Sequence, residues 1–161
     1  MFRSGIGYDI HRFKAGRKLV LGGVEIPHAC GLEGHSDADV LSHAIADALL
    51  GAIGERDIGH HFPNSDESIR GISSLEILRR VGEILADRNC RVVNLDASLI
   101  AEAPKIGPYL EAMREKIAEA LGLTLHALGS RRRRTKAWVP WAAAKAWPRS
   151  PWRAWSKGEF A

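Results

Sequence analysis

The sequence predicts an α+β fold, with a mixed sheet and helices packed on one of its faces. Four strand-like segments and three helical patterns alternate along 161 residues, a length that suits a single domain with its own core. No apolar run reaches the roughly 20 residues of a membrane span, and no secretory signal is recognisable at the start. Cys30 and Cys90 lack C-x-x-C spacing, which indicates a reduced, cytoplasmic protein.

The first third of the chain predicts a strand, a hairpin and a helix. Residues Arg3–His11 are expected to form the first strand. Lys18–Leu21 and Val24–Ile26 flank Gly22-Gly23, a pair that favours a tight hairpin turn. From Ala38 to Ile53 the apolar residues recur at helical spacing, so this segment is expected to be a helix.

The remaining elements follow in the same way. Ser73-Ser74 is expected to cap a helix that runs to about Asn89. Apolar residues alternate over Arg91–Ala101, which is typical of a strand with one buried face. Pro108–Leu121 predicts the last helix, and Gly122 stands at its expected C-cap. This order suits helices on one face of a mixed sheet.

Asp9, His11 and His43 form a candidate metal site. Residues two apart on a strand point to the same face, so the first strand presents Asp9 and His11 together. The following helix would supply His43. Three such ligands with an open fourth position are typical of catalytic zinc. The alternative is a strand histidine that is satisfied by a nearby carboxylate.

The helix that carries His43 begins in a polar loop. Ser36 or Asp37 is the expected N-cap, with Asp39 in the first turn. Asp39, His43 and Asp47 are spaced four apart, so they share one face of the helix. Both carboxylates would then orient the His43 ring. For Asp39, a place on a solvated polar face is the alternative.

Six ordered segments resemble those of one enzyme family. They are Gly7–His11, Leu21–Pro27, Gly34–Val40, Asp57–Gly59, Phe62–Asp66 and Ala101–Lys105. Together they are similar to the 2-C-methyl-D-erythritol 2,4-cyclodiphosphate synthases of non-mevalonate isoprenoid biosynthesis. The resemblance covers about residues 2–125 and implies a homotrimer with active sites between neighbouring subunits.

The resemblance also implies a reaction and its cofactors. In this family the 2-phosphate of 4-diphosphocytidyl-2-C-methyl-D-erythritol 2-phosphate attacks the β-phosphorus, closes a cyclodiphosphate ring and releases CMP. Such chemistry depends on positioning and charge stabilisation. Asp9, His11 and His43 would hold zinc, or manganese or cobalt, and magnesium would bridge the substrate diphosphate. The partners expected are this small cytidine substrate and further copies of the chain, without membrane or nucleic acid.

Further site residues follow from the resemblance by position. His35 and Ser36 would contact the 2-phosphate, and His35 would stabilise the transition state. Two loops would hold the methylerythritol unit, although Asn64 and Ser65 could equally be structural turn residues. A later segment would receive the cytidine through backbone groups and Lys105. The implied substrate-binding residues are Asp9, Ile10, His11, His35, Ser36, Asp57, Ile58, Gly59, Phe62, Pro63, Asn64, Ser65, Asp66, Ala101, Glu102, Ala103, Pro104, Lys105, Ile106 and Gly107.

The C-terminal segment differs in composition from the rest. Residues 128–161 hold all five tryptophans and nine of the 23 basic residues, but only one of the 19 acidic ones. The first 127 residues therefore have 14 basic and 18 acidic residues and a net charge of −4, against +4 for the whole chain. We expect no strand or capped helix from Gly129 to Ala161. The family's Thr-Thr-x-Glu strand, glycine turn and final helix are missing there.

A single-base slip in the coding DNA near Leu125–Gly129 explains this segment. Read from the third base of each codon, Ser130–Trp138 permits Val-Lys-Ala-Lys-Thr-Asn-Glu-Gly-Leu-Gly, followed by a glycine-rich turn and an alanine-rich helix. The chain thus divides into a catalytic domain, 1–127, and an aberrant, frameshifted tail, 128–161. Loss of an internal strand is expected to leave the written chain poorly folded or inactive.

Two other functions fit parts of the sequence. A divalent-metal phosphohydrolase could use the same Asp-x-His and His ligands on simple phosphate esters. Alternatively, the body could be an inactive scaffold for a nucleic-acid-binding tail, since arginines neutralise phosphates and tryptophans stack on bases.

Overall fold

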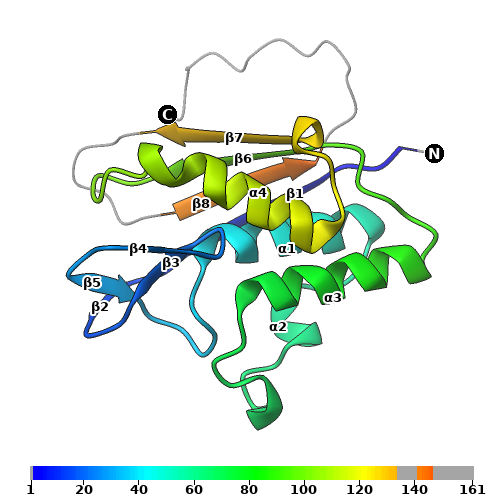
Figure 1. Cartoon of the computed structure of the whole chain (residues 1–161). Helices are drawn as coiled ribbons and strands as arrows, with labels where there is room; N and C mark the ends of the chain where they lie inside the picture. The colour runs from blue at the N-terminus through cyan, green and yellow to red at the C-terminus, as the bar shows by residue number, and fades with distance from the viewer. Residues whose placement is uncertain (1, 134–140, 147–161) are drawn as a thin grey trace, which may run out of the picture.

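A four-stranded mixed sheet forms one layer of the fold (Figure 1). The computed structural model describes residues 2–133 and 141–146, and from residue 130 onward its backbone alone. The strands lie in the order β1 (Gly5–Ile10), β8 (Trp141–Ala146), β6 (Leu95–Ile100) and β7 (Leu128–Arg133). β6 and β7 are parallel, whereas β8 runs antiparallel to both β1 and β6. The predicted mixed sheet is confirmed.

Helices α1 (Val40–Ile53), α3 (Ser74–Asp87) and α4 (Leu110–Leu121) gather on one side of this sheet (Figure 1). They confirm the three helices expected from the sequence. Alternate residues of β6 are buried in the same core as apolar side chains of α1 and α4; these core residues include Leu95, Ala97, Leu99, Leu41, Ile45, Met113 and Ile117. Among the described residues, no helix is long and apolar enough to cross a membrane.

Short elements surround this core. β3 (Leu19–Leu21) and β4 (Val24–Ile26) form the hairpin predicted around Gly22-Gly23, where both glycines have positive φ angles. β2 (Phe13–Ala15) pairs with β5 (Cys30–Leu32), a ribbon that the sequence did not indicate. One further short helix, α2 (Ile58–His61), follows α1, and three 3₁₀ turns cover Glu67–Ile69, Gly107–Tyr109 and Leu125–Ala127.

The segment after residue 128 corrects the expectation that it has no strands. β7 pairs with β6 from Leu95↔Leu128 to Ile100↔Arg133, and β8 fills the position between β1 and β6. An internal strand is therefore present in the structure. This strand could not be predicted because β8 consists largely of alanine, which is depleted in strands. The expected absence of a glycine turn and a final helix falls on residues outside the described ranges.

Strand β1 lies unusually close to helix α1, because glycines replace side chains at the contact. A Cβ atom built on Gly7 would lie 1.9 Å from the carbonyl oxygen of Ala44, and one on Gly5 would lie 2.0 Å from that of Ala48. These are backbone atoms, which cannot rotate away as a side chain can. Gly5 and Gly7 thus allow the strand to pack directly on the helix backbone.

We predict that Gly7→Ala destabilises the fold by about 2 kcal/mol or more, because the strand and helix must separate to admit the methyl group. Gly51→Ala is the matched control, since Gly51 lies on the same helix and a Cβ there has nothing within 4 Å. That substitution should stabilise the chain by about 0.5–1 kcal/mol through helix propensity. Urea unfolding of both variants measures the difference. Equal stabilities would contradict the close contact.

Candidate metal centre

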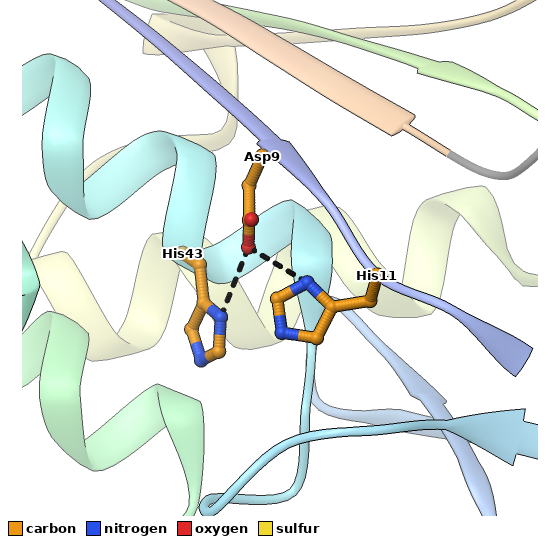
Figure 2. Close-up of side chains that lie close together, drawn as sticks. All are labelled: Asp9, His11 and His43. Atoms are coloured by element: carbon orange, nitrogen blue, oxygen red, sulfur yellow. Dashed lines mark hydrogen bonds and ion pairs between the residues drawn. The ribbon is translucent and has the colours of Figure 1, made fainter. Parts of the chain in front are cut away.

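Asp9, His11 and His43 converge at the end of β1 (Figure 2). Oδ2 of Asp9 lies 3.1 Å from Nδ1 of His43 and 3.2 Å from Nδ1 of His11. Each of the three residues offers a ligand atom, and these atoms all lie within 4.8 Å of one another. Of the described residues, these are the ones that form such a group. The strand and helix predicted to supply the ligands do bring them together.

The backbone explains how the three side chains meet. Gly5, Gly7 and Asp9 are alternate residues of β1, so Asp9 continues the row that faces α1. His43 lies in the first turn of α1, which Asp39 caps by accepting hydrogen bonds from the backbone N–H groups of Leu41 and Ser42. The expected N-cap, Ser36 or Asp37, is therefore wrong by two or three residues.

Electrostatics favours a negative Asp9 between two imidazoles. Burial alone would raise the pKa of Asp9, but the hydrogen bond with His43 and the close approach and charge of both histidines outweigh it and bring this pKa well below its ordinary value. Burial would lower the pKa of His43, yet the hydrogen bond and charge of Asp9, with smaller contributions from Asp39 and Asp37, raise it. The site thus attracts positive charge, which protons supply when no metal ion does.

The donor set fits a divalent metal ion. Nδ1 of His11 is buried without a hydrogen-bond partner; its 3.2 Å approach to Asp9 does not form a hydrogen bond. An unpaired buried nitrogen is costly unless a ligand uses its lone pair. One carboxylate and two imidazoles are ligands that zinc, manganese and cobalt accept. The cluster also opens into a cleft of about 530 Å³, which leaves room for a further ligand.

Two hydroxyl groups, rather than the expected carboxylates, hold the other nitrogen of His43. Nε2 lies 3.1 Å from Oγ of Ser36 and 3.0 Å from Oγ of Ser74. Asp39 instead binds the N-terminus of α1 and the N–H of Gly23, and Asp47 accepts a hydrogen bond from the N–H of Ile58. The two carboxylates act on His43 through charge rather than contact. Burial raises the pKa of both.

The model of the YgbB family matches residues 2–135. The chain belongs to this family. The match extends ten residues beyond residue 125, where the sequence resemblance was expected to end.

Two relatives of the chain share one enzyme name. The 2-C-methyl-D-erythritol 2,4-cyclodiphosphate synthase of Alkaliphilus metalliredigens is 60% identical over 121 residues, which are 75% of this chain and 76% of that protein. The enzyme of the same name from Caldicellulosiruptor bescii is 56% identical and covers 75% of this chain and 77% of that protein. The expected family is confirmed.

Solved structures agree with this assignment. A 2C-methyl-D-erythritol-2,4-cyclodiphosphate synthase superposes with a TM-score of 0.85 at 33% identity, covering 90% of this chain and 99% of that one. The CDP complex of IspF from Plasmodium falciparum gives a TM-score of 0.77 at 28% identity, over 89% of this chain and 93% of that one. Because 90% of 161 residues exceeds 127, the structural likeness extends into the C-terminal segment.

The cleft beside the metal centre collects half of the substrate-binding residues that the family resemblance implies. Its walls come from the loop before α1, from α2 and from the loop that follows α2. The implied residues that line it are Asp9, His11, His35, Ser36, His43, Asp57, Ile58, Gly59, Phe62, Asn64 and Asp66, and Asp47, inferred from its spacing to His43, lines it as well. Other residues line it that the sequence did not single out, namely Glu67, Ile69, Arg70, Ile72 and Ile77.

Some implied residues do not line this cleft. Ile10 is 47% exposed and alternates with Asp9, so it lies on the opposite face of β1. Pro63 and Ser65 alternate with lining residues of their loop and are exposed. The segment Ala101–Gly107, expected to receive cytidine, follows β6 and is absent from the cleft walls of the described chain.

We predict that His43→Ala and His11→Ala each weaken zinc binding by more than about 100-fold, because each removes one of three ligands. His60→Ala is the control, since His60 is an exposed histidine of α2 outside the cluster. Competition with a chromophoric chelator measures the dissociation constants, and circular dichroism confirms folding. Loss of binding in the His60 variant with retention in the other two would place the metal elsewhere.

Proposed function

We propose that this chain is a metal-dependent phosphorus–oxygen lyase of isoprenoid biosynthesis. It converts 4-diphosphocytidyl-2-C-methyl-D-erythritol 2-phosphate to 2-C-methyl-D-erythritol 2,4-cyclodiphosphate and CMP. The observation that carries this proposal is the Asp9, His11 and His43 cluster at one end of a cleft that also holds His35 and Ser36. Members of the family at 50–60% identity carry the name of this enzyme.

The residues of the cleft divide the chemistry between them. His35 and Ser36 bind the attacking 2-phosphate, and His35 stabilises the charge of the transition state as the new phosphorus–oxygen bond forms. The guanidinium of Arg17 supports this loop by donating to the carbonyl oxygens of Gly34 and Ser36 at 2.5 and 2.7 Å. Asp57–Gly59 and the Phe62–Asp66 loop hold the methylerythritol unit in place. The 2-phosphate and the β-phosphorus belong to one substrate molecule, so positioning of this kind holds its two anionic ends in a reactive geometry.

Asp9, His11 and His43 hold the metal ion, for which zinc is the proposed occupant. When bound, the ion supplies a Lewis acid that polarises a β-phosphate oxygen. Imidazole ligands favour zinc, manganese or cobalt at this site over magnesium, which prefers oxygen ligands. Magnesium is therefore assigned to the substrate diphosphate.

We further propose that the active enzyme is a homotrimer. The row formed by Ile6, Tyr8 and Ile10 lies on the face of β1 turned away from α1 and is 65%, 56% and 47% exposed, respectively. An apolar row of this kind suits contact with another copy of the chain. Ala101–Gly107 would then complete a neighbouring subunit's cleft and receive its cytidine. Solved relatives with bound CDP support a cytidine nucleotide as the ligand.

The frameshift and the cytoplasmic location also remain proposals. Both cysteines are free thiols, which suits a reducing compartment. The re-read codons support the division of the chain at residue 127, because they restore the Thr, Glu and Gly residues that the family carries. β7 and β8 provide strands in the written chain but not these side chains.

We predict that a chain with the frame restored from Ser130 releases CMP from the diphosphocytidyl substrate at least about 100-fold faster than the written chain, because Thr and Glu contacts to the substrate return. Metal-dependent CMP release, followed by chromatography, measures both. Equal activities would show that the written tail suffices. Hydrolysis of simple phosphate esters without CMP release would instead favour a phosphohydrolase.

The trimer is tested by a charge in the exposed row. Ile6→Asp should convert a trimer of the frame-restored chain to monomers, since a carboxylate would be buried without a partner at the interface. Val93→Asp is the matched control, because Val93 is 53% exposed but lies outside this row. Size-exclusion chromatography with light scattering measures the mass. A trimeric Ile6→Asp variant would exclude this face from the interface.

A further inference from the structure

Ser74 is a buried serine that links the metal centre to helix α3. It is the first residue of α3, follows the N-cap Ser73 and has no exposed surface. Its Oγ lies 3.0 Å from Nε2 of His43 and forms a short hydrogen bond with Oδ1 of Asp37. Ser74 does not line the cleft. Any role in the reaction must therefore pass through His43.

The hydrogen bonds from His43 to Ser74 and from Ser74 to Asp37 have a defined donor and acceptor at each step. A carboxylate only accepts, so the Ser74 hydroxyl donates its proton to Asp37. The serine oxygen is then left as an acceptor for His43, which makes Nε2 the protonated nitrogen. In a neutral imidazole the other nitrogen, Nδ1, then carries the free lone pair. Nδ1 is the nitrogen that faces Asp9 at 3.1 Å, where the metal ion would lie.

We propose that Ser74 and Asp37 are positioning residues for the metal centre, which fix His43 with Nε2 protonated and Nδ1 free to bind the ion. This inference rests on the proposed metal site at Asp9, His11 and His43. Metal-bound histidines commonly donate their second ring N–H to an oxygen, which fixes ring orientation and tautomer. Here a hydroxyl fills that place, and a carboxylate behind it sets the direction of the hydrogen bonds.

Backbone hydrogen bonds hold Ser74 and Asp37 in place. Asp37 also accepts a hydrogen bond from the N–H of Ser74 at 2.9 Å, and its own N–H donates to the carbonyl of Ile72 at 3.2 Å. The N–H of Gly71 donates to the carbonyl of His35 at 3.0 Å. The loop that binds phosphate and the start of α3 therefore form one hydrogen-bonded unit, with His43 against it.

Ser36 differs from Ser74 although both hydroxyls approach Nε2 of His43. Ser36 lines the cleft, and its Oγ accepts a hydrogen bond from the N–H of Ala38 at 3.1 Å. Among the described residues, the partners of this hydroxyl are Nε2 of His43 and the N–H of Ala38, and neither is a carboxylate. With Ser74 holding the ring, the Ser36 proton remains available to a substrate phosphate.

The test compares zinc binding in four chains. Ser74→Ala removes the oxygen that accepts the hydrogen bond from Nε2 of His43. Asp37→Asn keeps the size of the side chain, but its amide can donate a hydrogen bond to Ser74 and so reverse the direction of the two hydrogen bonds. Both should weaken zinc binding by about 10-fold or more. Ser73→Ala is the control, because Ser73 caps α3 through the N–H of Leu75 without contacting His43. Chelator competition gives the dissociation constants, with circular dichroism as the check on folding.

The tautomer provides a second readout that a loss of packing would not change. In nitrogen-15 spectra of the zinc-loaded native chain, the proton of the His43 ring should lie on Nε2. A proton on Nδ1, or Ser74→Ala and Asp37→Asn chains that bind zinc as tightly as Ser73→Ala, would overturn the proposal. If the native chain itself binds no zinc, or if His43→Ala binds it unchanged, the proposed metal site fails as well.

Discussion

The contact between β1 and α1 is the constraint on which the rest of the structure depends. Glycines at residues 5 and 7 let the strand pack against the backbone of Ala44 and Ala48. Asp9 is the next residue in the same row of the strand, and His43 precedes Ala44 on the helix. The same approach that closes the core therefore brings a carboxylate to within 3.1 Å of an imidazole. The packing of β1 on α1 therefore also assembles the candidate metal site.

The charges of the site follow from this geometry. Asp9 is half-buried between two imidazoles, which lower its pKa and keep it negative despite burial. A divalent cation can replace the protons that the histidines would otherwise hold. The start of α3 then fixes the far side of His43 through Ser74, and Asp37 joins that helix to the loop carrying His35 and Ser36. Two helices and one strand thus position the side chains of the candidate metal site.

The sequence predicted what short-range patterns encode. The three long helices and the Gly22-Gly23 hairpin could be predicted because periodicity and turn residues are local. The metal cluster could also be predicted, although Asp9 and His43 are 34 residues apart, because aspartate and histidine are metal-ligand types. The contact of Ser74 with His43 could not be predicted, since a serine has many roles and Ser73-Ser74 indicated only a helix cap. Strand β8 escaped prediction because alanine carries little strand preference. The cytidine segment followed from resemblance alone, and in the described chain it does not line the cleft.

X-ray absorption at the zinc edge of the loaded chain tests most directly whether the strand–helix contact builds the metal site. The structure predicts scattering from two imidazole rings, with nitrogens at about 2.0–2.1 Å, and from one carboxylate oxygen at a similar distance. A sulfur at about 2.3 Å would place the ion at a cysteine instead. A single imidazole would show that His11 and His43 do not bind together. Either result would contradict the account.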